Sequence, residues 1–209
     1  MGPAKANGWV VLPSLKCYSE SMEIGETHRK KCRRYNLPGN AHELTFSCFR
    51  GRPFLTKDRT RRFLVEAILE AKRKHSFDLW AHVVMPEHVH MLLCPREESY
   101  SIAAILRAIK QPVARRAMIY LREHNPSGLS WMATGRSSVA YRFWQAGGGY
   151  DRNMTCVETI VKAARYIHEN PVRRGLVVDP CEWAYSSAQD WETGTSGLLP
   201  IDFDTFPTT

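Results

Sequence analysis

The sequence predicts an α+β fold, in which separate helices pack on an antiparallel sheet as a ferredoxin-like sandwich. Three observations predict it. β-rich and helical segments follow one another in the order β-α-β-β-α-β-α-β, two adjacent β segments are joined by only two residues, and each helical segment carries an apolar stripe. A chain of 209 residues, 44% of them hydrophobic, can bury one core of this kind.

The first half of this pattern contains a strand, a helix and a hairpin. Apolar and polar residues alternate over residues 43–49, which predicts a strand with one buried face. A helix is expected over residues 57–75, because its apolar residues recur every three or four positions. The β-rich runs 77–85 and 88–94 are separated by Pro86 and Glu87, a spacing that predicts a tight hairpin.

The second half begins with a helix near Ser101, which Pro112 is expected to kink or divide. Residues 125–136 are rich in Gly, Ser and Pro and predict a loop, and residues 141–144 predict a short strand before a run of three glycines.

A third helix is expected over residues 155–170, because residues 155–158 fit a capping box and Pro171 is expected to end the helix. Residues 175–178 are interpreted as a last edge strand.

The charge of the chain is unevenly distributed. The net charge is +8, but residues 176–209 hold six acidic and no basic residues, so residues 1–175 carry +14. The positive charge of this region favours a polyanionic partner. We expect a basic N-terminal extension over residues 1–35, a folded domain over 36–195 and an acidic tail over 196–209, which lies away from the partner or folds over the basic surface.

The six cysteines contain no CxxC pair and are interpreted as reduced thiols in a cytoplasmic protein. No apolar run approaches the roughly 18 residues that a membrane span requires, so we expect no membrane partner.

Two pairs of side chains suggest chemistry. His88 and His90 lie two apart in a predicted strand and therefore share a face. They could bind a divalent cation, although an isolated His-x-His pair is more often structural. In the third helix Tyr166 and Asn170 lie one turn apart, opposite the apolar stripe, where a surface tyrosine is an equally good interpretation. An Asn170 oxygen beside two imidazoles would suit Mg²⁺ or Mn²⁺.

Three motifs carry a family resemblance: VMPEHVHMLL at residues 84–93, YIHENPVRRGLV at 166–177 and EWAYSS at 182–187. Over residues 38–195 the chain resembles the single-tyrosine transposases of the HUH nuclease group. Within that group it is most similar to the REP-associated tyrosine transposases, bacterial proteins linked to repetitive extragenic palindromes.

The resemblance implies a ferredoxin-like catalytic domain in which His88, His90 and Asn170 bind the metal and Tyr166 attacks single-stranded DNA. It implies a single-stranded DNA endonuclease and strand transferase with a 5′-phosphotyrosine intermediate, acting on hairpins with adjacent single-stranded guides and associated with the nucleoid. The chain departs from the family at Glu87, where Asn is usual. It departs again at Gly148-Gly149, where many relatives have an aromatic residue.

Substrate binding is expected to involve basic side chains, each of which could equally be a solvated surface charge. These are Arg50, Arg52, Lys110, Arg115, Arg116, Arg152, Arg173 and Arg174. Aromatic side chains available for stacking on unpaired bases are Tyr141, Phe143, Trp144 and Tyr150, some of which must belong to the core.

Two other functions fit the same residues. A catalytically silent DNA-binding protein that represses or bridges repeats would have the same basic surface. A metal-dependent hydrolase that uses His88 and His90 without nucleic acid would keep its activity in Tyr166→Phe. We expect a monomer, as in the repeat-associated group; the alternative is a dimer, since related single-tyrosine transposases exchange the tyrosine helix within dimers.

Overall fold

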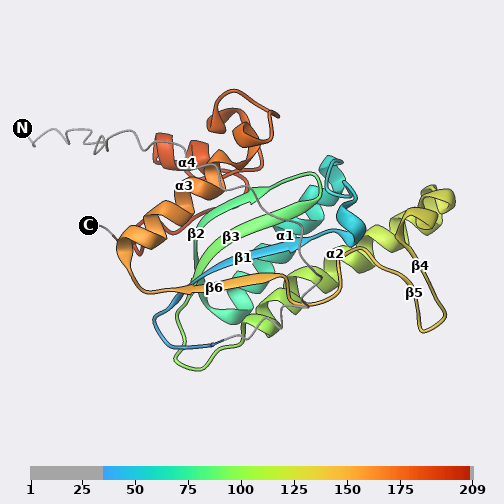
Figure 1. The fold of residues 1–209 in the computed structure, drawn as a ribbon, viewed down its shortest axis with the longest axis horizontal. Coiled ribbons are helices and arrows are strands. Elements are labelled where there is room, and N and C mark those ends of the chain that lie inside the picture. The colour runs from blue at the N-terminus through green and yellow to red at the C-terminus, as the bar shows by residue number, and fades with distance from the viewer. Residues whose placement is uncertain (1–34, 208–209) are drawn as a thin grey trace, which may run out of the picture. The chain divides into compact units, whose positions relative to one another are not determined.

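The computed structural model describes residues 35–207. The expected N-terminal extension lies outside these residues except for Tyr35. Four strands form one antiparallel sheet in the order β2-β3-β1-β6 (Figure 1). They are β1 (Ala41–Ser47), β2 (Phe77–Val84), β3 (His88–Pro95) and β6 (Tyr150–Met154).

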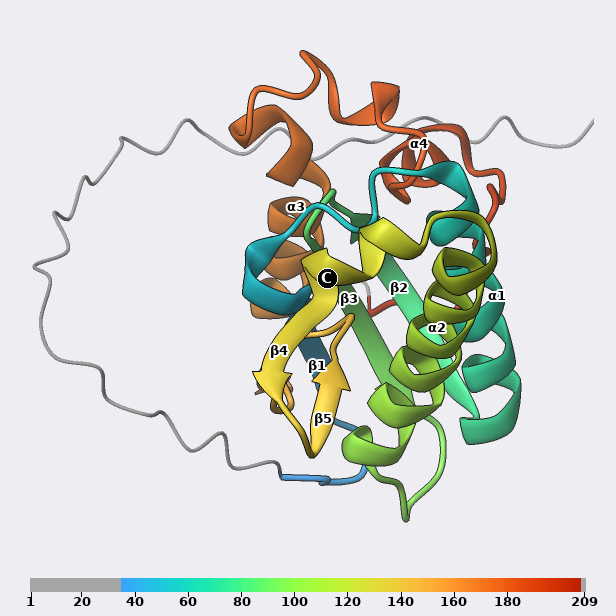
Figure 2. The same ribbon diagram turned by 90° about the vertical axis from the view of Figure 1, so that its right-hand side faces the viewer.

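Helices cover both faces of this sheet. α1 (Asp58–His75) and α2 (Ile102–His124) pack together on one face, and α3 (Val157–Arg173) lies on the other (Figure 2). This arrangement confirms the expected α+β class. The remaining elements are short: η1 (Phe49–Gly51), η2 (Pro126–Met132), β4 (Ala133–Arg136), β5 (Val139–Tyr141), η3 (Pro180–Glu182) and α4 (Ala188–Thr193).

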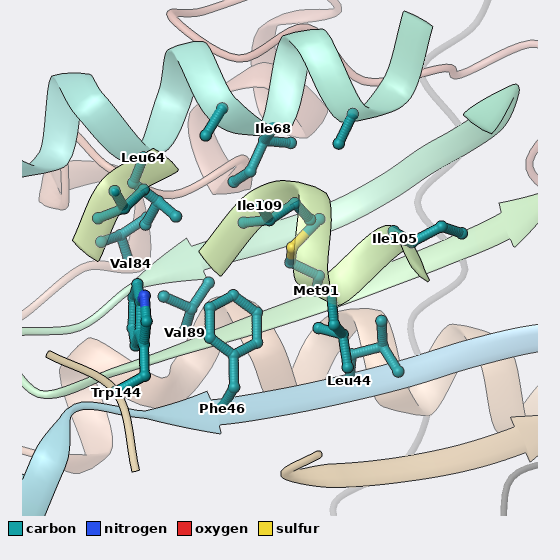
Figure 3. Packing of buried hydrophobic residues seen from close by; sticks show 14 of the residues in the cluster. Leu44, Phe46, Leu64, Ile68, Val84, Val89, Met91, Ile105, Ile109 and Trp144 are labelled. Atoms are coloured by element: carbon teal, nitrogen blue, oxygen red, sulfur yellow. The ribbon is translucent and has the colours of Figure 1, made fainter. Parts of the chain in front are cut away.

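The main core lies between the sheet and the α1–α2 pair. Leu44, Phe46, Val89 and Met91 point to this side and are almost fully buried. In Figure 3 they pack against side chains of both helices, among them Ile68. The intervening residues of the same strands face α3. The apolar residues that alternate along β1 therefore form a buried face, as predicted.

The fourth strand differs from the prediction. It is β6 and not residues 141–144, while residues 175–178 form no strand. Gly149 explains the difference, because its φ is +75° and a Cβ there would lie 2.0 Å from the carbonyl oxygen of Thr45. The glycine run thus brings the chain back against β1, so that the following residues can pair with it. The segment expected to be a loop also contains β4, which pairs with β5.

Both helical prolines behave differently from expectation. α2 continues through Pro112 without division, since the buried residues Ile109 and Val113 hold both sides of the proline on the core. α3 continues through Pro171 to Arg173. The predicted capping box is also wrong, because the helix begins after Cys156 and no side chain caps it.

The C-terminal segment beyond residue 195 contributes to the core. Leu199 and Ile201 are buried, and the carboxylate of Asp202 accepts a hydrogen bond from the Leu79 backbone in β2. Asp202 also pairs with Lys72 of α1 at 2.7 Å. Part of the acidic charge is therefore neutralised at the β2 edge of the sheet. Within the part of the chain that the structure describes, no helix is long and apolar enough to cross a membrane.

Candidate active site

The two histidines of β3 lie on the sheet face that α3 covers. Their rings are nearly perpendicular, with centroids 4.7 Å apart. In the register of the sheet, Ser47 lies opposite His88 and Thr45 opposite His90. Alternation along the strand therefore brings the imidazoles together, as predicted.

Each histidine has a partner for one ring nitrogen. The Nδ1 atom of His90 lies 2.8 Å from the hydroxyl of Thr45, and the Nδ1 atom of His88 lies 3.1 Å from a carboxylate oxygen of Glu87. Contacts of this kind fix the orientation of an imidazole and leave Nε2 as its ligating atom.

Burial favours the neutral form of both rings. Burial and, to a smaller extent, the neighbouring His88 together lower the pKa of His90 to about 4. Burial also lowers the pKa of His88, against the opposing effect of Glu87. Neutral imidazole is the form that binds a metal ion.

Tyr166 projects from α3 toward this pair. Its ring centroid lies 5.9 Å from that of His90, the two rings are perpendicular, and 41% of the residue is exposed. The guanidinium of Arg173 lies 5.2 Å from the tyrosine ring centroid. The Tyr166 ring thus lies beside His90, and solvent can reach the side chain.

Asn170 is buried, whereas the helical pattern placed it opposite the apolar stripe. Its Nδ2 atom donates to the carbonyl of Tyr166 at 2.7 Å and more weakly to that of Ile167 at 3.4 Å. Because Pro171 has no N–H to give to Ile167, the amide supplies a donor where the proline removes one. This contact turns the amide oxygen away from the helix carbonyls.

Glu87, the departure from the family pattern, forms an ion pair as well as contacting His88. Arg174 donates to the same Glu87 oxygen at 2.6 Å. The extra negative charge beside His88 is therefore shared with a cation from the end of α3.

An open pocket of about 660 Å³ extends from Tyr166 and His90 across β1 to β6. Its other lining residues are Glu43, Thr45, Tyr150, Arg152, Thr159, Lys162 and Ala163. Burial raises the pKa of the Glu43 carboxyl, and the charge of Arg152 opposes this effect. Sequence reasoning missed Glu43, Thr45 and Lys162. The alternation in β1 identified the polar face, but the pairing of Thr45 with His90 needed the sheet register.

The predicted basic residues fall into two groups. Arg152 lines the pocket, Arg173 lies over the Tyr166 ring and Arg174 pairs with Glu87. The others lie on η1, the segment that follows it and α2, and are Arg50, Arg52, Lys110, Arg115 and Arg116. Of these eight residues, the structure therefore brings only Arg152, Arg173 and Arg174 to the site of Tyr166 and the histidine pair.

The aromatic residues also separate by burial. Phe143 and Trp144 belong to the core and Tyr141 is partly buried against it, whereas Tyr150 is half exposed in the pocket. Tyr150 alone of these four remains a candidate for stacking beside Tyr166.

Comparison with known proteins defines the class. The family model for IS200-like transposases matches residues 41–170, a span that includes the histidine pair, Tyr166 and Asn170. The chain belongs to this family, which confirms the class predicted from the three motifs. Family membership makes it a DNA-processing transposase.

Two individual proteins refine the comparison. A Haemophilus influenzae protein named as a REP-associated tyrosine transposase is 25% identical over 138 residues, which cover 63% of this chain and 74% of that protein. A solved structure of a REP-associated tyrosine transposase bound to a REP hairpin has a TM-score of 0.60 at 22% identity. The match covers 86% of this chain and 98% of that one, and shows a common fold.

Proposed function

We propose that this protein is a metal-dependent, single-stranded DNA endonuclease and strand transferase that acts through a 5′-phosphotyrosine on hairpins of repetitive extragenic palindromes. The observation that carries this proposal is the exposed Tyr166 ring standing 5.9 Å from His90, at the end of an open pocket that Arg152 and Lys162 border. Nucleophile, imidazole pair and cations for phosphates then meet in one place.

The reaction is a transesterification at one phosphodiester. The Tyr166 oxygen forms a bond to phosphorus, the bond from phosphorus to the 3′ oxygen breaks, and the tyrosine proton ends on the released 3′-OH. The phosphodiester energy is retained in the tyrosine linkage, so another 3′-OH can reverse the step and join a new strand. Arg173, over the Tyr166 ring, is suited to holding a phosphate beside the nucleophile.

The donor set fits a divalent cation. The proposed ligands are the imidazoles of His88 and His90 with the amide oxygen of Asn170, the set that the family resemblance implies. Among the described residues, no three His, Cys, Asp or Glu side chains form a metal-binding group. The Nδ1 contacts with Thr45 and Glu87 support this assignment, because metal-binding histidines have such partners. Bound Mg²⁺ or Mn²⁺ would polarise the phosphate and neutralise developing negative charge.

Two observations support a hairpin as the substrate. The solved relative with the same fold is bound to a REP hairpin. This chain also has basic residues on both sides of the tyrosine pocket, which suits a strand that passes through it.

Two end-labelled forms of one hairpin oligonucleotide with single-stranded flanks test the proposal. After incubation with Mn²⁺, a denaturing gel should show the 3′ label on a protein–DNA adduct and the 5′ label on a free, shorter strand. Tyr166→Phe should form no adduct but should still shift the hairpin in a native gel. Tyr150→Phe, in the same pocket, is the matched control and should form the adduct.

Two results would contradict this function. A hairpin that is bound without cleavage or adduct would identify a silent DNA-binding protein. Cleavage that persists in Tyr166→Phe would identify water, and not the tyrosine, as the nucleophile.

A further inference from the structure

A second pocket lies on the opposite side of the sheet from Tyr166, between α1, α2 and η2, with a volume of about 330 Å³. Its walls are mostly aromatic and aliphatic: Phe63, Tyr120, Leu121, Trp131, Met132 and Phe143. Trp131 is 56% exposed at its mouth. An exposed indole at an apolar pocket is a frequent binding feature.

Three guanidinium groups lie on the aromatic rings around this pocket. Arg59 is 3.2 Å from the ring centroid of Tyr120, Arg116 is 3.9 Å from that of Phe63, and Arg52 is 4.6 Å from that of Trp131. Arg116 also pairs with Glu66, whereas Arg52 and Arg59 have no carboxylate partner among residues 35–207. The mouth therefore combines flat apolar surfaces with positive charge.

Two uncharged polar side chains line the same pocket. Thr60 of α1 is buried, and Asn125 follows the last residue of α2. A hydroxyl and an amide can each donate and accept hydrogen bonds. An apolar slot with one or two such groups suits a flat heterocycle that has polar edges.

The pocket is connected to the histidine site by backbone hydrogen bonds. The Cys48 N–H donates to the carbonyl of Glu87 at 2.7 Å, and the Leu55 N–H donates to that of Pro86 at 2.9 Å. Pro53 and Phe54, between these two points, line the pocket. The pocket thus lies beyond the end of β3 that carries His88.

We propose that this pocket holds one unpaired nucleobase of the DNA, in the single-stranded flank of the hairpin, with Arg52 and Arg59 on the phosphates beside it. The inference rests on the proposed function and adds a base-binding site to it. The base stacks on Trp131 inside the apolar slot, while the adjoining backbone meets the cations at the mouth. An aliphatic peptide would use the slot but would leave both guanidinium groups without an anion.

Abasic substitution tests this site without cleavage. Fluorescence anisotropy would measure the Kd of Tyr166→Phe protein for a labelled hairpin, with an abasic site placed in turn at each flanking position. One position should weaken binding about tenfold, the effect of losing one stacked base. In protein that also carries Trp131→Ala, the intact hairpin should bind about tenfold more weakly, and the abasic site at that position should have no additional effect.

Tyr35→Ala is the matched control, because Tyr35 is also 56% exposed and lies near the opposite end of β1. Protein with this change should keep the abasic effect at the same position. If the hairpin binds but no position couples to Trp131, the base site is wrong and the proposed function stands. If Trp131→Ala instead dissociates a dimer in sedimentation, the occupant is a second copy of the chain and the base site is also wrong. Failure of Tyr166→Phe protein to bind the hairpin at all would contradict the proposed function itself.

Discussion

The two faces of the sheet are built by the same strands but differ in chemistry. Val89 and Met91 of β3 are fully buried under α1 and α2, whereas His88 and His90 face α3. α3 packs its apolar residues mainly on β2 and Leu92, and leaves the β1–β6 side as an open pocket. One fully covered face can therefore supply the stability, while partial cover of the other face leaves room for a substrate.

Truncation of neighbouring residues on β3 should affect the two faces of the sheet differently. Met91→Ala should lower the free energy of unfolding by about 2–5 kcal/mol, because it opens a cavity in the main core. His90→Ala should cost about 1 kcal/mol, for the lost contact with Thr45, but should reduce hairpin cleavage at least about 100-fold. Urea unfolding and the adduct gel measure the two effects. Equal losses of stability would show that the histidine face is also a structural core.

Gly149 tests how the open side of the pocket is formed. Gly149→Ala should destabilise the protein by about 2–3 kcal/mol, since its Cβ would collide with the Thr45 carbonyl and displace β6. Gly147→Ala, also at positive φ but with open space around its Cβ, should cost about 1 kcal/mol. Thermal or urea unfolding compares the pair. If both variants lose the same stability, the close approach to β1 is not the cause.

His82 is a buried histidine that lies opposite Met91 in the sheet, on the main-core side of β2, and it should make the protein sensitive to acid. Burial, helped by His168, lowers the pKa of His82 to about 3, and its Nδ1 has no hydrogen-bond partner among the described residues. In the unfolded chain this histidine has its ordinary pKa, so it binds a proton at a higher pH than it does in the folded protein. The free energy of unfolding therefore falls as pH drops below about 6.5. From pH 6.5 to 4.5 this group should contribute a loss of about 2–3 kcal/mol.

Urea unfolding of wild type and His82→Leu at several pH values measures this contribution. The difference between the two proteins should shrink or reverse in favour of the variant as pH falls. A difference that is independent of pH would contradict the assignment.

The smallest effect is expected for Glu87, which contacts His88 at the edge of the candidate metal site. Glu87→Gln should weaken Mn²⁺ binding about tenfold, because the neutral amide holds the His88 ring and Arg174 less strongly. Isothermal titration with Mn²⁺ in the absence of DNA measures it. Glu97→Gln, an exposed glutamate in the loop after β3, is the control and should bind Mn²⁺ as wild type does. Equal affinities for both variants would mean that Glu87 does not position His88.

Much of the fold followed from local patterns. The β2–β3 hairpin, the histidine pair on one face and the apolar stripe of α1 depend on residues close together in the chain, where periodicity is informative. The missed strand depends on a distant partner. β6 forms because Gly149 can approach Thr45, and residues so far apart in the chain give no local signal of that contact. The end of α3 was missed for a different reason: the helix continues through Pro171, with the Asn170 amide bonded to helix carbonyls.

The class of protein, the alternation of β3 and the candidate nucleophile and ligands could all be predicted from the sequence, because each lies in a short motif. Contacts between distant segments depend on the tertiary structure. The fold aligns Thr45 with His90, joins Glu87 to Arg174 and separates the basic residues near the Tyr166 site from those on η1, the following segment and α2. The physical reason is that sheet register and helix packing bring together residues more than 40 positions apart, and their spacing in the chain does not encode that proximity.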